Sequence, residues 1–314
     1  MLTYRKRAAG AALAGVLLLA GATACEGGDK GGTGKAAAPS PAADRSPVRR
    51  TADEAAVDAL MSAYEKTSAA KSAKVRMAVR VPKPTGALGD PIETTGVQGW
   101  DPSVVDLTVK GASAPGLGSG TVRVIGLNGI SYVQLPADSP LASGGKRWVK
   151  LDLKEPGGTT GALSRLGGLG DAPQQGQDPA TLLALMISSP NLKHVGAETV
   201  EGADTEHYAG TLTVDELRGD ANPVLTPSDR SKLVTAMGTA GIQAYSLEVW
   251  VDRAGLPVRT KTTAETPGGT DLAHMQFQVD ASYAEYGAAA TAQAPPEDET
   301  LDLFGMLTKP GEGA

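Results

Sequence analysis

The chain is poor in cysteine, histidine and aromatic residues. Of its 314 residues one is cysteine and three are histidine, and aromatic residues make up 4%. A single cysteine excludes an internal disulfide, so the fold has to rest on its own hydrophobic core. With 41% hydrophobic and 20% charged residues, the composition permits such a core.

Motifs that would identify an enzyme or a metalloprotein are also missing. The sequence contains no nucleophile elbow, phosphate-binding loop, zinc-protease helix or paired-cysteine motif. Residues 116–120 approach the first of these motifs, but a flexible glycine-rich loop explains them better. His194, His207 and His274 are not spaced as ligands on one helix face. We therefore expect no catalytic activity, no cofactor and no metal, and three separate surface or strand histidines.

The N-terminal segment has the layout of a signal peptide. A basic start at Arg5–Arg7 precedes an apolar run that ends at Cys25 and is shorter than the about 20 apolar residues of a spanning helix. Residues Leu18–Cys25 resemble the lipobox of bacterial lipoproteins, in which the cysteine receives a diacylglyceryl group and becomes the first residue after cleavage. Ala24 fits that pattern, whereas Ala22 stands where leucine is usual.

This resemblance implies a lipid-anchored protein. We expect that residues 1–24 are removed, that Cys25 is the lipidation site, and that the protein lies at the extracytoplasmic face of the cell membrane. An ordinary secretory signal with an unrelated cysteine is the alternative. Residues 25–50 combine glycine, alanine, proline and serine with scattered charges and no apolar periodicity, which predicts a disordered tether.

The charge balance is acidic. Lysine and arginine number 29 against 35 aspartate and glutamate residues, giving a net charge of −6. The predicted signal peptide holds three basic and no acidic residues, so its removal takes the net charge from −6 to −9. An acidic chain binds polyanions poorly, so we expect no nucleic-acid partner and contact with anionic lipid only through the anchor.

Residues 51–290 are predicted to form one domain, followed by a flexible tail at residues 291–314. Thr51 and Glu54 form a capping box for a helix that runs from Ala52 to about Ala69. Further helices begin at Asp178-Pro179 and at Thr226. Alternating apolar and polar residues predict strands over residues 74–81, 94–100, 104–110, 121–127, 130–135, 147–153, 193–200, 206–214, 243–252, 256–264 and 273–279.

Sustained alternation predicts an antiparallel sheet with one buried face, in an α+β fold that is mainly β. A sheet of ten to eleven strands curls, so we expect a half-barrel with the helices packed in its concave side. Trp148 and Trp250 fall on the polar side of their strands and are expected to cover the outside of the sheet. The glycine-rich segment Glu155–Gln177 is either a lid over a cavity or a disordered excursion.

Five features in this order resemble the LppX/LprG-type lipoproteins of actinobacteria, which share the fold of the lipoprotein carrier LolA. They are the opening helix that leads into a hairpin, Ile130–Val133, Lys146–Asp152, Val195–Glu198 leading to His207–Gly210, and Val249–Asp252 with Gly255–Pro257. The resemblance implies a half-open barrel that helices close over an apolar cavity. In that family the cavity binds acyl chains of lipids or lipoglycans.

Two functions follow from these observations. The first is a membrane-anchored lipid-binding protein or carrier, and the alternative is a non-catalytic interaction module tethered to the membrane for an envelope partner or signalling system. Because large aromatic residues are few, we expect an apolar pocket of roughly 300–1,000 Å³ beneath the helices. The apolar sides of the predicted elements supply its candidate lining residues: Leu60, Tyr64, Met77, Leu107, Met186, Leu247 and Phe277.

The lipid anchor gives a direct prediction. Cys25→Ala should abolish the incorporation of labelled fatty acid and should release the protein to the medium or leave it unprocessed. Without the thiol no diacylglyceryl group can be attached. Even a single myristoyl chain gives only marginal membrane binding, with K of about 10⁴ M⁻¹, so a protein without any acyl chain should not stay anchored. Ser40→Ala, in the predicted tether, is the control and should label like the wild type. Equal labelling of the Cys25 variant and the wild type would contradict the assignment.

Overall fold

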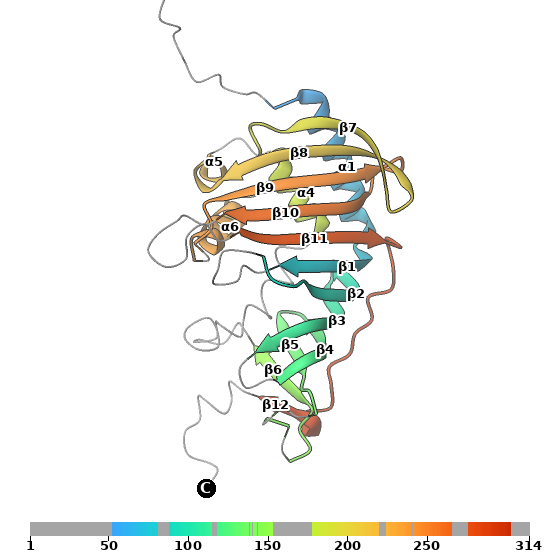
Figure 1. Ribbon diagram of the computed structural model, residues 1–314, viewed down its shortest axis with the longest axis vertical. Coiled ribbons are helices and arrows are strands. Elements are labelled where there is room, and N and C mark those ends of the chain that lie inside the picture. The colour runs from blue at the N-terminus through green and yellow to red at the C-terminus, as the bar shows by residue number, and fades with distance from the viewer. Residues whose placement is uncertain are drawn as a thin grey trace, which may run out of the picture. The chain divides into compact units, whose positions relative to one another are not determined.

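The structure is a computed structural model that describes residues 52–80, 88–114, 118–137, 139, 141–142, 144–152, 178–219, 224–239, 241–265 and 276–302 (Figure 1). All of these residues belong to the compact unit Arg49–Ala314. Cys25, the predicted signal peptide and tether, the whole segment Glu155–Gln177 and His274 lie outside the described residues. Within the described ranges, no helix combines the length and the hydropathy needed to cross a membrane.

The described strands form one open sheet in the order β12-β6-β5-β4-β3-β2-β1-β11-β10-β9-β8-β7. All neighbours are antiparallel except β12 and β6, and the two outermost strands have one neighbour each. The predicted mainly β fold is thus confirmed, with twelve strands in the described part. The strand bounds are β1 Ser72–Arg80, β2 Ile92–Trp100, β3 Ser103–Ala114, β4 Gly118–Leu127, β5 Ile130–Gln134, β6 Trp148–Asp152, β7 Lys193–Val200, β8 Ala203–Thr213, β9 Ala244–Asp252, β10 Pro257–Glu265, β11 Gln276–Ala284 and β12 Thr300–Asp302.

The sheet consists of two meanders that meet at β1 and β11. Strands β1 to β6 follow one another on one side of this seam, and β11 back to β7 follow on the other. At the seam Val75 lies opposite Tyr283, and Met77 lies opposite Ala281. The seam therefore joins strands that are about 200 residues apart in the chain, so it makes one sheet out of two local units.

Helices pack on the β8–β9 end of the sheet. The helix α1 (Glu54–Ala70) packs on α4 (Pro179–Ile187), α4 packs on β8 and β9, and α5 (Val214–Arg218) packs on α6 (Pro227–Thr239) and β8. A short 3₁₀ helix, η1, covers Glu297–Glu299. Figure 1 shows α1 and α4 side by side against the strands.

The start of α4 is built as the sequence predicts. The Asp178 carboxylate accepts hydrogen bonds from the Ala180 backbone N–H at 2.9 Å and from the Thr181 hydroxyl at 3.0 Å. Pro179 occupies the first turn, where its missing N–H costs nothing. The helix is apolar on all sides and every one of its residues except Thr181 is buried. Burial raises the pKa of Asp178, against the effect of the hydrogen bonds it accepts.

The start of α1 differs from the prediction. The N-cap is Asp53, whose carboxylate accepts from the Ala55 N–H at 3.1 Å, so the capping box of Thr51 and Glu54 is wrong. The Asp53 N–H donates to the Leu192 carbonyl at 3.0 Å. This long-range bond holds Asp53 in an extended conformation, and the helix can therefore begin only at Glu54.

Two further boundaries were wrong in the C-terminal half. The final strand of the predicted set ends at Val279, but β11 continues to Ala284 and brings Ala281 and Tyr283 into the core. The strand predicted to reach Val214 ends at Thr213, because Thr213 and Glu216 form a capping box that starts α5. The Thr213 hydroxyl accepts from the Glu216 backbone N–H, and the Glu216 carboxylate accepts from the Thr213 backbone N–H. This reciprocal pair favours the start of a helix over a continued strand.

The predicted flexible tail begins inside the fold. Residues Thr300–Asp302 form β12 and pair in parallel with β6, with Thr300 opposite Trp148. The Lys146 ammonium group donates to the carbonyls of Asp298 and Thr300, both at 2.9 Å. These contacts order a polar segment that has no apolar periodicity of its own, so the prediction of a tail from residue 291 is wrong up to residue 302.

The seam between the meanders predicts that neighbouring residues of β1 contribute very differently to the free energy of unfolding. Met77 is 2% exposed in the central core, whereas Arg76 points to the opposite face and is exposed. Met77→Ala should lower the free energy of unfolding by about 2–5 kcal/mol, because it leaves a cavity at the seam. Arg76→Ala should change it by less than about 0.5 kcal/mol. Urea unfolding measures both, and equal losses would show that the β1–β11 seam does not carry the core.

Candidate functional site

The inner face of the sheet carries the apolar side chains, and the helices cover part of it. Around α1, α4, α5 and α6, these side chains form one buried cluster with β8 and β9, which we call the helix cluster. Its members include Leu60 of α1, Leu183 of α4 and Leu247 of β9, which are 0%, 0% and 2% exposed. The helix cluster is closely packed and leaves these side chains out of contact with solvent.

The residues predicted to line a cavity are divided between two places. Leu60, Met186 and Leu247 belong to the helix cluster, and Tyr64 is half-buried against it. Met77 and Leu107 belong to a second cluster on β1, β3 and β11, which we call the seam cluster. Phe277 is half-buried on β11. Five of the seven are thus buried in these two clusters, Phe277 belongs to neither, and the role of all seven in binding a ligand stays a prediction.

The other apolar clusters of the inner face contain no helix residue among the described residues. The seam cluster consists of strand residues such as Val75, Met77 and Leu107, with Trp100 and Tyr286 packed against it. A third cluster lies on β3 to β6 and includes Val124, Val133 and Val149. The apolar inner face is therefore much wider than the part on which the helices pack.

Two of the hollows at the surface of the described residues are well defined, and neither lies beneath the helices. One, of about 360 Å³, lies on the outer face of β4 and β6, between Trp148 and the segment that contains Pro295 and Pro296. The other, of about 420 Å³, lies at the ends of β7, β8 and β9 and is lined mainly by polar side chains such as Glu198 and Arg253. The predicted apolar pocket is not one of these two hollows.

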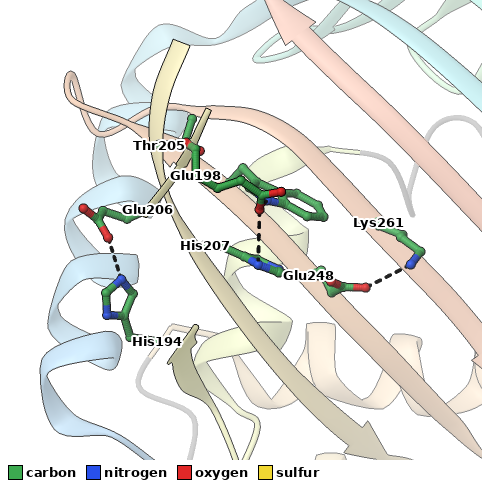
Figure 2. A network of polar contacts seen from close by, with 8 residues as sticks. His194, Glu198, Thr205, Glu206, His207, Glu248 and Lys261 are labelled. Carbon is green, nitrogen blue, oxygen red and sulfur yellow. Dashed lines mark hydrogen bonds and ion pairs between the residues drawn. The ribbon is translucent and has the colours of Figure 1, made fainter. Parts of the chain in front are cut away.

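A polar network occupies the outer face of β7 to β10 (Figure 2). The His207 ring stacks on Trp250 at 4.3 Å between centroids, and its Nε2 lies 3.1 Å from the Glu248 carboxylate. The Trp250 indole N–H donates to Glu198 at 2.6 Å, and the Lys261 ammonium group donates to Glu248 at 3.1 Å. The sequence gives no local signal for this network, because its members come from four strands.

The network continues toward the seam. The guanidinium of Arg259 lies 5.2 Å from the Trp250 ring centroid and makes two hydrogen bonds to Asp280. The Asp280 hydrogen bonds raise the pKa of Arg259, which stays charged. Because Arg259 pairs with Asp280 and Lys261 pairs with Glu248, the network is suited to holding strands together rather than to activating a nucleophile.

His194 and His207 lie apart, and Trp148 and Trp250 cover the outside of the sheet as predicted. His194 pairs with Glu206 at 2.6 Å on the inner side of the hairpin, whereas His207 lies on the outer face. Among the described residues no three metal-ligating side chains converge. Trp250 and Trp148 are on the outer face and are 6% and 8% exposed, because neighbouring groups lie over them.

Polar side chains are also present on the inner face, at the seam. The Tyr283 hydroxyl lies 3.3 Å from the Thr260 hydroxyl, and the Tyr286 hydroxyl donates to the Pro257 carbonyl at 2.7 Å. Burial raises the pKa of both tyrosines, which therefore stay uncharged at neutral pH. The sequence prediction missed Tyr283 because it ended the strand at Val279, although the alternation of Phe277, Val279, Ala281 and Tyr283 continues.

Comparison with known sequences gives two relatives from Streptomyces. No family model matches the chain. An uncharacterised 31.2 kDa protein from the rplA–rplJ intergenic region of Streptomyces griseus is 27% identical over 266 residues, which are 81% of each chain. A protein of Streptomyces coelicolor named as a "putative lipoprotein" is 25% identical over 291 residues, which cover 89% of this chain and 85% of the relative.

Comparison with solved structures gives lipoproteins and a LolA-type protein. The lipoprotein LppX of Mycobacterium tuberculosis aligns with a TM-score of 0.45 and 13% identity, over 77% of this chain and 100% of LppX. LprF of Mycobacterium bovis aligns with a TM-score of 0.43 and 14% identity, over 78% of this chain and 99% of LprF. A LolA superfamily protein of Nitrosomonas europaea aligns with a TM-score of 0.22 and 15% identity, over 73% of this chain and 91% of that protein. LppX and the LolA superfamily, both named in the resemblance stated from the sequence, are among these neighbours.

The position of α4 over the sheet depends on one glycine. A Cβ atom on Gly210 of β8 would lie 2.6 Å from the Ser189 hydroxyl oxygen, directly after α4. Gly210→Ala should therefore displace the end of α4 and lower the free energy of unfolding by about 1–3 kcal/mol. Gly238→Ala, in α6 with open space around it, should raise it by about 0.5–1 kcal/mol. Chemical denaturation measures both changes. If Gly210→Ala left the free energy of unfolding unchanged, the close approach of the end of α4 to β8 would be contradicted.

Proposed function

We propose that the protein is a membrane-anchored lipoprotein that binds an acyl chain of a lipid, or another apolar ligand, between its helices and the inner face of its sheet. The observation that carries this proposal is the width of the apolar face. The clusters on β1 to β6 contain no helix residue in the described part of the chain, so much of that face is not used to hold the helices. A protein that only needed a stable core would not require so wide an apolar face.

The anchor and the location belong to the same proposal. Cys25 follows a signal-like segment, and its modification would hold the domain at the extracytoplasmic face of the membrane. The relative from Streptomyces coelicolor supports this reading, because its name describes a lipoprotein and the alignment covers 89% of this chain. Lipids would then be available close to the domain, with the predicted tether setting its reach.

Burial of hydrocarbon provides the binding energy. Each buried methylene contributes about 0.8 kcal/mol, so roughly ten methylenes supply about 8 kcal/mol before the cost of ordering the chain is subtracted. No nucleophile paired with a base is needed for such binding, and the polar network on the outer face is not suited to provide one. The proposed activity is therefore uptake and release of a ligand rather than a reaction.

A tethered interaction module is the second candidate. Two observations favour it: the helix cluster is closely packed, and the hollow of about 420 Å³ at the ends of β7 to β9 is at the surface. A protein partner would use such a surface without entering the interior. Native mass spectrometry of the purified protein separates the two candidates, because a carrier should retain lipid and a module should give the bare mass.

Binding of a pyrene-labelled fatty acid, followed by fluorescence and alongside thermal unfolding, tests the carrier function. Ala184 of α4 is 1% exposed, and Ala184→Phe should fill the space that a ligand would enter. We expect at least a roughly ten-fold loss of affinity, equivalent to about 1.4 kcal/mol. Overpacking costs about 1–3 kcal/mol of stability, so Ala184→Leu is the smaller variant if the first does not fold.

Ala78→Phe is the matched control. Ala78 lies on β1 opposite Asp280, on the outer face, so a phenylalanine there should leave binding unchanged. If the wild type takes up no probe, or if the folded Ala184 variants bind like the wild type, the carrier proposal is wrong and the interaction module takes its place.

A further inference from the structure

Three polar atoms are buried on the inner face without any hydrogen-bond partner. They are the hydroxyl oxygen of Thr67, the side-chain amide oxygen of Gln98 and the indole nitrogen of Trp100. Thr67 is 0% exposed and Gln98 is 3% exposed. A buried polar group without a partner costs about 1–3 kcal/mol, so several at one place in a protein call for an explanation.

The three residues lie near the junction of α1 and β1. Gln98 and Trp100 are two residues apart on β2 and share its inner face, where Gln98 lies between Ala73 and Val105 of the neighbouring strands. The backbone N–H of Trp100 donates to the Lys71 carbonyl at 2.9 Å. Thr67 is four residues before Lys71, which is about one helical turn.

Thr67 lies on the buried side of α1. The buried residues of α1 are Ala56, Leu60, Ala63 and Thr67, which recur every three or four residues along one side of the helix. Three of these are apolar, and the hydroxyl of Thr67 is the exception at the end nearest β2. The end of α1 that carries Thr67 is thus the end that adjoins β2 through the hydrogen bond between Trp100 and Lys71.

The surroundings of these groups are apolar or uncharged. The Trp100 ring lies 6.3 Å from the Tyr286 ring, and Tyr286 lies 6.4 Å from Tyr283, which belongs to the seam cluster. The lysines at this end of α1 point elsewhere: Lys66 donates to the Ala254 carbonyl at 2.8 Å, and Lys71 pairs with Asp101 at 2.9 Å.

The nearby ionisable groups disfavour a negatively charged ligand. Burial raises the pKa of Tyr283 and Tyr286, and the charge of Asp178 raises both further. Asp178 itself lies at the buried start of α4. An anion that entered this region would meet a carboxyl group and uncharged tyrosines, and would lose its hydration without gaining a cation.

We propose that Thr67, Gln98 and Trp100 form a polar recess that hydrogen-bonds an uncharged oxygen-containing group of the ligand, such as the hydroxyl or ester carbonyl of an acylglycerol. The Trp100 N–H donates to a carbonyl oxygen, the Gln98 oxygen accepts from a hydroxyl, and the Thr67 hydroxyl does either. This inference rests on the proposed function, because it specifies which class of lipid the interior prefers. It selects uncharged lipids over fatty acids and phosphate-bearing lipids.

Three probes with the same pyrene-labelled chain test the recess: a monoacylglycerol, a fatty acid measured at pH 8 and a hydrocarbon without a polar group. The variants Thr67→Val, Gln98→Leu and Trp100→Phe each remove a polar atom while keeping most of the side-chain volume. We expect the wild type to prefer the monoacylglycerol and each variant to bind it about five-fold to ten-fold more weakly, the effect of one hydrogen bond. Affinity for the hydrocarbon should not change.

Stability of the empty protein is the second readout. The unfolding midpoint of each variant should be unchanged or higher, because an unpartnered polar atom is replaced by an apolar one. Thr95→Val, on the exposed outer face of β2, is the control and should alter neither binding nor stability.

Each contrary result has a distinct meaning. If all variants bind the monoacylglycerol like the wild type, or if the wild type prefers the fatty acid, the recess is wrong while acyl-chain binding stands. A lower unfolding midpoint in the variants would show that water or protein groups satisfy these atoms, which also overturns the recess. If the wild type binds none of the three probes, both the recess and the proposed function are wrong.

Discussion

The pairing of β1 with β11 is the interaction on which the rest of the structure depends. Each half of the sheet is a meander of neighbours in sequence, and such units form from local contacts. Seven residue pairs, from Lys74 with Ala284 to Arg80 with Gln278, join the two halves. This seam places the seam cluster in the same sheet as strands β8 and β9 of the helix cluster, so the two halves share one inner face.

Strand alternation then separates two chemistries on the two faces of one sheet. On the outer face, charged and aromatic side chains such as His207, Trp250 and Arg259 satisfy one another across neighbouring strands. On the inner face, apolar side chains dominate, and the few polar groups there are either paired, as Tyr283 is with Thr260, or left without partners, as Gln98 is. A face that is mostly apolar with a few unpartnered polar atoms is suited to a ligand that is mostly hydrocarbon.

The helices are placed by specific contacts as well as by their apolar surfaces. Gly210 lets the end of α4 approach β8 closely, and the Asp53 N–H fixes the start of α1 to the Leu192 carbonyl just beyond α4. The two helices are thus tied at the β8 side of the sheet. This arrangement leaves the inner face of β1 to β6 to clusters made of strand and loop residues in the described part of the chain.

The sequence by itself determined the class of fold and most of its local elements. Period-two alternation located the strands, and Asp178-Pro179 located the start of α4, because both signals depend on neighbouring residues. It also indicated which side chains of each element face inward, since Leu60, Met77 and Leu247 follow directly from that periodicity. The resemblance to LppX-type lipoproteins came from the order of several such local features.

Only the tertiary structure decided how these elements meet. The Asp53 cap, strand β12 and the ordered residues before it depend on partners far along the chain: Leu192 for Asp53, and Lys146 for Thr300, which is 154 residues away. The network around His207 and the recess around Gln98 likewise draw on residues from separate elements. Periodicity within a segment carries no information about which distant segment will lie beside it, so these sites become visible only when the chain is folded.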